Sequence, residues 1–304
     1  MTKKILIPLF FIGFLGLIYL YVSFGVANYN ILLSIRLPRL LLAFLSGFIL
    51  AGVGYAFQVM LNNPLAEPYI LGISSGAAFG SILATVSGMF LLTPIFGFVG
   101  ALLTMILVWN LAHIGGMFDK TKLLLSGIIV GMFFSALISL IIFFNQQDIS
   151  NILSILMGNL GHIFSILEWK IFIAVFIVSI GLMIYLFSLA KQLQILSTGD
   201  LVAVSLGIDI KKLRRRIFIV SSLLTGITVA YAGIIGFIGL VVPHLIRMIF
   251  SSRQDILYSA LGGAFLLILC DFIAMHIAVV ELPVGIITSF IGCPFFIYVM
   301  SKNK

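Results

Sequence analysis

The residues that could do chemistry in this sequence are few and widely spaced. Its four histidines lie in different segments, and Cys270 and Cys293 lie in apolar stretches, so neither a metal site nor a disulfide is predicted. The sequence contains no G-x-x-x-x-G-K-S/T phosphate loop, no H-E-x-x-H, no C-x-x-C and no G-x-S-x-G motif. We therefore predict that the chain is not an enzyme and uses no cofactor.

The composition indicates the environment of these scattered residues. Of the 304 residues, 62% are hydrophobic and 9% are charged, and the mean hydropathy is +1.30, whereas a soluble domain carries about 25% charged residues. A helix needs about 20 apolar residues to cross a lipid bilayer. Long apolar runs therefore predict an all-α polytopic membrane protein, in which the net charge of +8 reports topology rather than binding to nucleic acid.

Breaks between the apolar runs give about ten predicted transmembrane helices within a single domain, residues 1–304. The eighth is short and begins near Gly236, Gly239 and Pro243, which favours a broken or half-length helix. A further amphipathic segment, 151–164, is expected to lie at the interface or to re-enter the membrane. The predicted spans are 5–26, 39–60, 70–88, 91–113, 122–144, 169–190, 214–233, 237–250, 258–280 and 285–301.

Basic residues orient these spans. With the N-terminus inside, fourteen of the seventeen Lys and Arg residues fall on the cytoplasmic side, and Arg36, Arg39 and Lys170 fall outside. The positive-inside rule therefore favours cytoplasmic N- and C-termini, and it makes Arg36 and Arg39 an anomaly that needs a reason. Asp271 is the only carboxylate well inside a predicted span, where an acid is either functional or paired locally.

Glycines at every fourth position indicate close contacts between helices. Gly72, Gly76 and Gly80 form one such series, and Gly127 and Gly131 form another. Small residues at this spacing let backbones approach, so we favour packing over a pore-lining face.

Four stretches carry the most specific patterns. They are R-x-P-R and N-P-L-A-x-P-x-x-L-G within 35–80, GDLVAVSLG at 199–207, G-F-I-G-L-x-x-P-H within 232–247, and ELPVG at 281–285. In this order the sequence resembles the FecCD-type permeases, the membrane subunits of ATP-binding-cassette (ABC) importers for iron chelates, haem and vitamin B12. The resemblance runs from about residue 35 to the C-terminus. It implies two permease copies, or one copy and a paralogue, around a central pathway in the cytoplasmic (inner) membrane of a bacterium.

The resemblance also implies partners and a cargo. A separate pair of ABC ATPase subunits would hydrolyse ATP, which fits the missing phosphate loop, and a substrate-binding protein would deliver the ligand from outside. The expected ligand is a ferric siderophore, with haem or cobalamin as alternatives within the family. An ion-coupled secondary transporter is the alternative from another class, although such carriers normally have more ionisable groups within their spans.

The resemblance places an ATPase-coupling segment of two short helices at about residues 191–213. Physically, its glycines permit tight turns, its aspartate is expected to cap a short helix, and its apolar side chains would supply a surface for the partner. The basic run 211–216 is expected to anchor the next span at anionic headgroups. The coupling residues predicted from the match are Gly199, Asp200, Ala203, Leu206 and Gly207.

On the outer side, Arg36 and Arg39 match family arginines that dock onto glutamates of the binding protein, a task that suits the bidentate guanidinium. Relatives often carry another arginine after the aspartate of the ninth span. Met275 and His276 stand there instead, so a third docking arginine is in doubt and His276 is at most a pH-sensitive substitute.

The family pathway is lined by the fifth and tenth spans and by the short segment after the fifth. Serines on membrane helices often bond to their own backbone, so their side chains are weak evidence for a pathway. The polar candidates on these segments are Ser126, Ser135, Ser139, Asn145 and Asn159.

Overall fold

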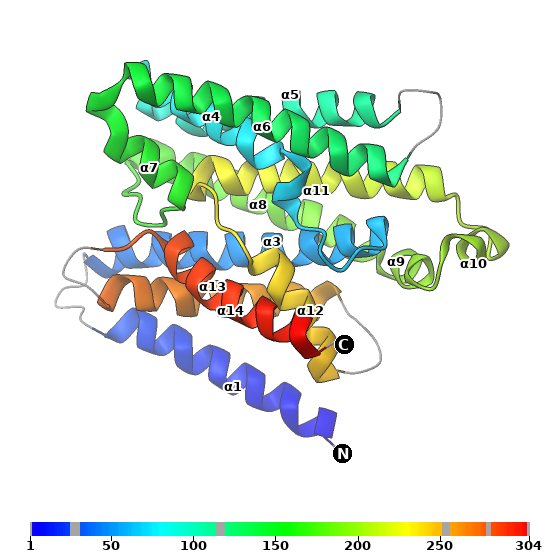
Figure 1. Cartoon of the computed structure of the whole chain (residues 1–304). Coiled ribbons are helices and arrows are strands. Elements are labelled where there is room, and N and C mark those ends of the chain that lie inside the picture. Colours follow the sequence, from blue (N-terminus) through cyan, green and yellow to red (C-terminus); the bar gives the residue numbers. More distant parts are fainter. Residues whose placement is uncertain (1, 25–30, 114–118, 251–255, 278–280, 303–304) are drawn as a thin grey trace.

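Helices joined by short connections make up the described part of the chain. The computed structural model describes residues 2–24, 31–113, 119–250, 256–277 and 281–302, and no strand occurs in these ranges. Figure 1 shows the longest helices lying side by side in one bundle. They are α1 (Thr2–Ser23), α3 (Leu37–Leu61), α4 (Ile73–Val86), α5 (Thr93–Ala112), α6 (Lys120–Phe144), α8 (Ile166–Ser188), α11 (Ile210–Ala232), α12 (Ile238–Phe250), α13 (Ile256–His276) and α14 (Val284–Lys302).

Each predicted span corresponds to one of these helices, which confirms the all-α polytopic class. Within the described residues, six helical stretches are long and apolar enough to cross a membrane alone. By contrast, α4 has 14 residues and α12 has 13, too few at about 1.5 Å per residue to cross roughly 30 Å of hydrocarbon. The half-length eighth span is therefore confirmed. The predicted third span, 70–88, contains α4 but is also shorter as a helix, because part of that apolar run precedes α4 as a separate short helix.

Shorter elements connect the long helices. A π-helical turn, η1 (Leu32–Arg36), leads into α3, and α7 (Ile149–Met157) follows α6 within the predicted amphipathic segment. Between α8 and α11 the chain forms two short helices, α9 (Ala190–Ser197) and α10 (Asp200–Ser205), as predicted. The remaining turns are the 3₁₀ helices η2 (Pro68–Leu71), η3 (Phe90–Leu92) and η4 (Gln146–Asp148).

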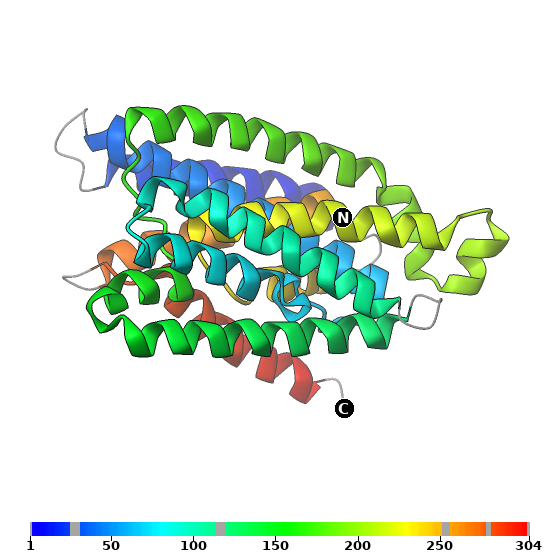
Figure 2. The ribbon, with the colours of Figure 1, turned by 90° about the horizontal axis from the view of Figure 1, so that it is seen from above.

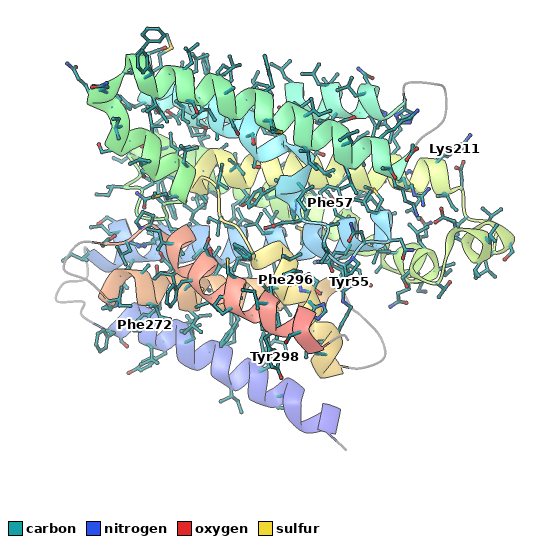
Figure 3. All side chains as sticks on the ribbon, viewed as in Figure 1. Tyr55, Phe57, Lys211, Phe272, Phe296 and Tyr298 are labelled. Carbon is teal, nitrogen blue, oxygen red and sulfur yellow. The ribbon has the colours of Figure 1, made fainter. Side chains whose placement is uncertain are left out.

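One end of the bundle carries the projecting helices. Figures 1 and 2 show α9 and α10 extending beyond the other helices, and the first turn of α1 and the last turn of α14 lie toward this same end. Lys211 lies there, whereas Phe272 lies near the opposite end (Figure 3). This arrangement fits the predicted topology, in which basic residues and both termini share one side, and the assignment of that side to the cytoplasm stays a prediction.

Helix α3 forms the centre of the core, with most of its 25 residues buried. Glycines set how closely its neighbours approach. A Cβ on Gly47 would lie 2.3 Å from the carbonyl oxygen of Gly263 on α13, and a Cβ on Gly54 would lie 2.0 Å from that of Gly239 on α12. Real Cβ atoms do not come this close to a carbonyl, so only glycine permits these backbones to touch.

The glycine series predicted to mark helix contacts do so. A Cβ on Gly80 of α4 would lie 2.1 Å from the carbonyl oxygen of Phe96 on α5, and one on Gly100 would lie 2.1 Å from that of Gly76. A Cβ on Gly127 of α6 would lie 2.6 Å from Cα of Leu71. The α4–α5–α6 group is therefore held by backbone contact, which confirms the packing interpretation.

Candidate functional site

Helix α10 presents an exposed apolar surface at the projecting end. Gly199 (φ +130°) and Gly207 (φ +80°) turn the chain on either side of it, in conformations that favour glycine. Leu201 is 88% exposed and Leu206 is 62% exposed, whereas Ala203 is buried. The predicted coupling residues are thus brought together in one short helix with its two turns, and large apolar side chains turned outward mark an interaction surface.

Asp200 was predicted to cap α10, but it does not. The N-cap position belongs to Gly199, and Asp200 is the first helical residue. Its two carboxylate oxygens each accept a 2.7 Å hydrogen bond from Nη2 of Arg214, and its Oδ1 lies 3.5 Å from Nζ of Lys120. A charge-assisted partner on another helix outweighs a local cap because the attraction between full charges is stronger.

Arg214 also departs from the prediction for the basic run 211–216. Its side chain is 10% exposed and bonded to Asp200, so it does not reach for headgroups, whereas Arg215 and Arg216 are exposed. Burial tends to raise the pKa of the Asp200 carboxyl, but the hydrogen bond and charge of Arg214, followed by the charge of Lys120, hold that pKa below its ordinary value. The pair is therefore ionised at neutral pH.

Arg39 lies in a buried ion-pair cluster at the opposite end of the bundle. Its Nε and Nη2 donate to Oδ2 and Oδ1 of Asp271 at 2.9 and 3.0 Å, and its Nη1 donates to Oε2 of Glu281 at 2.5 Å. The hydroxyl of Tyr21 donates to Oδ2 of Asp271 at 2.5 Å. The sequence left two roles open for Asp271, a functional one and local pairing, and the structure shows it paired.

This cluster does not present Arg39 for docking in the way that the sequence led us to expect. The Arg39 side chain is 4% exposed and already bonded to two carboxylates, so in this conformation it cannot offer its fork to a partner. Arg36 is half-buried, its Nη1 donates to the carbonyl oxygen of Tyr21 at 3.3 Å, and its guanidinium lies 6.0 Å from the Tyr21 ring centre. Of the two predicted docking residues, Arg36 is the one nearer the surface.

His276 ends α13 at the same side of the bundle. Its ring is exposed, and Nδ1 lies 2.7 Å from the carbonyl oxygen of Phe272, one helical turn earlier. Nε2 is not engaged by that contact. His276 is thus exposed at this end of the bundle, and its substitution for a docking arginine stays a prediction.

The polar candidates for the pathway divide into two groups. The hydroxyls of Ser126 and Ser139 donate to backbone carbonyl oxygens four residues earlier, and Nδ2 of Asn145 does the same. Ser135 is exposed on α6. These contacts are the self-bonding expected of membrane serines, so they give α6 a weakly polar surface without a preorganised binding site. Asn159 is different, because it lies in the loop after α7.

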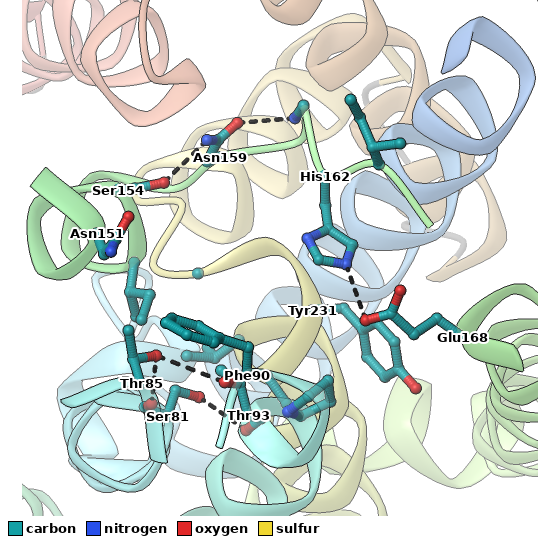
Figure 4. A pocket seen from close by; sticks show the side chains of 17 residues that line it. Ser81, Thr85, Phe90, Thr93, Asn151, Ser154, Asn159, His162, Glu168 and Tyr231 are labelled. Atoms are coloured by element: carbon teal, nitrogen blue, oxygen red, sulfur yellow. Dashed lines mark hydrogen bonds and ion pairs between the residues drawn. The ribbon is translucent and has the colours of Figure 1, made fainter. Parts of the chain in front are cut away.

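A cavity of about 440 Å³ opens beside Asn159, between α4, α5, α7, α8 and α11. Figure 4 shows Asn159 bonded to Ser154 on one wall, while Nε2 of His162 lies 3.6 Å from Oε1 of Glu168 on another. Asn159 Oδ1 also accepts from the backbone nitrogen of Gly161 at 2.7 Å. Asn159, Ser154, His162 and Glu168 in the wall of this cavity are therefore engaged with other protein groups.

A second cavity, of about 660 Å³, is largely apolar and lies where α7, the segment 233–237 and α14 meet. Its wall includes Met157, Ile234, Gly236 and Phe290, with Ser289 as a polar side chain. It brings together the tenth predicted span and the segment after the fifth. That juxtaposition is the one expected for a pathway lining.

Comparison with known proteins identifies the protein class. The model of the FecCD transport family matches residues 7–302. The chain belongs to the FecCD transport family. A Helicobacter pylori (strain J99) protein named as a probable iron chelatin transport system permease is 38% identical over 278 residues, covering 90% of this chain and 83% of that one. The hemin transport system permease HmuU of Yersinia pestis is 35% identical over 290 residues, covering 91% and 85%.

A solved structure described as an inward-facing metal-chelate type ABC transporter has the same fold, with a TM-score of 0.83 and 30% identity over 97% of this chain and 99% of that one. This FecCD protein is thus a multi-pass membrane permease of the ABC importer class, as the sequence predicted.

In this FecCD permease two of the motifs that carried the resemblance, N-P-L-A-x-P-x-x-L-G and G-F-I-G-L-x-x-P-H, are in contact. Glu67, from N-P-L-A-x-P, accepts at 2.9 Å from the backbone nitrogen of Phe237, and the hydroxyl of Tyr69 accepts at 3.0 Å from that of Ile235. These two side chains hold the G-F-I-G turn, where Phe237 adopts φ +69°. The sequence analysis missed both, although an acid within the two-proline motif N-P-L-A-x-P was an available signal.

The P-H-L-I-R motif is held in a similar way. Pro243 lies inside α12 without ending it, contrary to prediction. Its missing N–H would leave the carbonyl oxygen of Gly239, four residues earlier, without its helical donor. Nε2 of Gln58 on α3 donates to that oxygen at 3.3 Å, and Nη2 of Arg247 donates to Oε1 of Gln58. The helix therefore continues because a neighbouring side chain replaces the lost bond.

Proposed function

We propose that this permease carries a ferric siderophore across the membrane and that a separate pair of ATPase subunits binds α9 and α10 to drive it. The observation that carries the ATPase contact is the outward-facing apolar surface of α10, with Leu201 and Leu206 exposed beside two positive-φ glycines. Such a surface outside the long apolar helices needs a partner. The names of the Helicobacter pylori relative and of the metal-chelate type transporter support an iron chelate as cargo.

The outer face would receive a substrate-binding protein. Arg36 is the docking residue we favour, because Arg39 is committed to its ion pairs. Charges at the rim of an interface mainly steer association and fix its register. Glu281, whose side chain is 60% exposed, lies beside this surface and adds a negative charge that the partner must accommodate.

Two permease copies, or one copy and a paralogue, would enclose the pathway. Helices α6 and α14 carry large exposed apolar side chains, among them Phe133 at 60% and Phe290 at 80%. The apolar cavity at Met157 and Phe290 supports a pathway along these helices. A weakly polar lining lets a bulky chelate pass without binding it tightly.

Haem or cobalamin is the alternative cargo, since the hemin permease of Yersinia pestis is nearly as similar. An ion-coupled carrier is less well supported. Asp271, the acid predicted deep in a span, is bonded to Arg39 and Tyr21, so it is not available as a carrier of protons or sodium ions.

Reconstitution into vesicles tests the proposal. The permease, its ATPase and its binding protein would be combined, and uptake of ferric siderophore, hemin and cobalamin would be measured with and without ATP. We expect uptake of the siderophore that requires both ATP and the binding protein. Uptake of hemin or cobalamin instead would reassign the cargo, and uptake driven by an ion gradient alone would contradict the class of mechanism.

A further inference from the structure

We infer that Asp200 is a positioning residue that transmits movement of α10 to α6 and α11. The inference rests on the proposed function, in which α10 contacts the ATPase. It concerns how a displacement of this six-residue helix reaches the helices of the bundle. The evidence is the set of contacts that Asp200 makes outside its own helix.

Asp200 joins three helices at one carboxylate. Arg214, in the second turn of α11, donates to both of its oxygens at 2.7 Å. Lys120, the first residue of α6, places Nζ 3.5 Å from Oδ1. Both target helices have their own N-cap aspartates, Asp119 and Asp209, so Asp200 is not needed to start either helix. Its contacts serve the connection between helices.

Apart from Asp200, α10 packs through the buried side chain of Ala203, and a glycine turn lies at each of its ends. Gly199 and Gly207 flank it, and a Cβ built on either would meet no atom within 4 Å. Open space and glycine backbones let α10 tilt relative to α9 and α11. Asp200 at its start is therefore the point at which such a tilt would pull on its neighbours.

The contacts of Asp200 with Arg214 and with Lys120 connect α10 to the parts of the molecule expected to open and close. Arg214 lies near the start of α11, and Ala232 is the last residue of that helix. The carbonyl oxygen of Ala232 accepts from the backbone nitrogen of Asn159 at 2.9 Å. The next segment continues this link, because the backbone nitrogen of Ile234 donates to the carbonyl oxygen of Ile155 on α7 at 3.0 Å. Helix α6 forms the proposed pathway wall. One carboxylate thus connects the ATPase surface with both α7 and α6.

The strength of the connection suits a cycle. The Asp200 side chain is 44% exposed and Lys120 is 29% exposed, so this contact is screened by solvent and readily broken and re-formed. The Arg214 contact is shorter and less exposed, at 10%. We therefore expect the contact between Asp200 and Arg214 to keep α10 bound to α11, while the contact between Asp200 and Lys120 of α6 breaks and re-forms.

The test uses the whole reconstituted importer and measures ATP hydrolysed per ligand taken up. Asp200→Asn should raise this ratio by about fivefold or more, the lower end of typical coupling between sites, and Lys120→Gln, which removes only the solvent-screened contact, should raise it by about two- to fivefold. Asp200→Glu should restore a ratio near that of the unchanged protein. Arg216→Gln, an exposed charge on the same end of α11, is the matched control and should change the ratio by less than about twofold.

The double variant Lys120→Gln/Asp200→Asn should be no worse than Asp200→Asn alone, because Asp200→Asn already breaks the ion pair that Lys120→Gln removes. Unchanged ratios for Asp200→Asn and Lys120→Gln would overturn the inference. So would loss of ATPase binding in a pull-down with Asp200→Asn, since Asp200 would then act in docking rather than transmission. If the unchanged protein shows no ATP-dependent uptake, the proposed function fails instead.

Discussion

Replacing Arg39 by glutamine should destabilise the permease far more than the same change at Arg36. Asp271 is completely buried, and its carboxylate accepts from Nε and Nη2 of Arg39 and from the hydroxyl of Tyr21. Arg39→Gln leaves only the Tyr21 contact of these three. Removing one partner of a buried ion pair typically costs about 3–5 kcal/mol, because the remaining charge stays out of water.

Thermal unfolding of the purified permease in detergent measures this cost. At about 2 °C per kcal/mol for a chain of this size, the Tm of Arg39→Gln should fall by roughly 6–10 °C. Arg36→Gln is the matched control, since it loses one 3.3 Å hydrogen bond and a cation–π contact. Those contacts together amount to about 1 kcal/mol at a half-exposed site, so its Tm should fall by about 2 °C.

A double variant separates charge from packing. In Arg39→Gln/Asp271→Asn no charge remains unpaired at the Asp271 position, so the double variant should recover more than half of the decrease in Tm that Arg39→Gln causes. Equal Tm values for Arg39→Gln and Arg36→Gln would refute the reasoning. A double variant no more stable than Arg39→Gln would show that lost packing, not a stranded carboxylate, causes the effect.

Three further predictions concern the docking face and the packing of α12 and α4. Arg36→Glu should slow association with the binding protein by roughly tenfold without lowering the Tm as Arg39→Gln does; an unchanged association rate at low salt would exclude Arg36 from docking. Gln58→Leu should cost about 1–3 kcal/mol in unfolding free energy, because it removes both the donor to the carbonyl oxygen of Gly239 and the acceptor for Arg247; a leucine variant as stable as the unchanged protein would argue against these bonds. Gly100→Val should lower the unfolding free energy by about 1–3 kcal/mol or more, because its Cβ would lie 2.1 Å from a carbonyl oxygen. Gly181→Val on α8, where a Cβ would meet no atom within 4 Å, should leave the unfolding free energy unchanged in the same assay.

The elements of this fold follow from local patterns. An apolar run long enough to span the membrane predicts a helix regardless of the segments packed around it, because the backbone must satisfy its own hydrogen bonds in lipid. Glycines four residues apart reported contact between α4 and α5 for a similar local reason. The two positive-φ turns around α10 were readable too, since only glycine adopts φ +80° or +130° easily.

The partners of single polar side chains were not readable in this way. Arg39 and Asp271 are 232 positions apart, and nothing in the sequence near Arg39 indicates that a carboxylate faces it. The same holds for Gln58 and the carbonyl of Gly239. Asp200 was assigned a local role for lack of a visible alternative, and only the crossing of α10, α11 and α6 supplies Arg214 and Lys120 as partners.

The two charge clusters differ in exposure, and that difference fits different tasks. At the end of the bundle opposite α10, Asp271 is fully buried and Arg39 nearly so, which makes their pair costly to break and able to hold α3 against α13. At the α10 end, the contact between Lys120 and Asp200 joins side chains that are 29% and 44% exposed, so this contact costs little to break. A contact that must be remade with every round of ATP hydrolysis has to be of the second kind. Under the proposed function, we therefore expect α6 to move during transport relative to a scaffold of α3 and α13 that the buried pair of Arg39 and Asp271 holds in place.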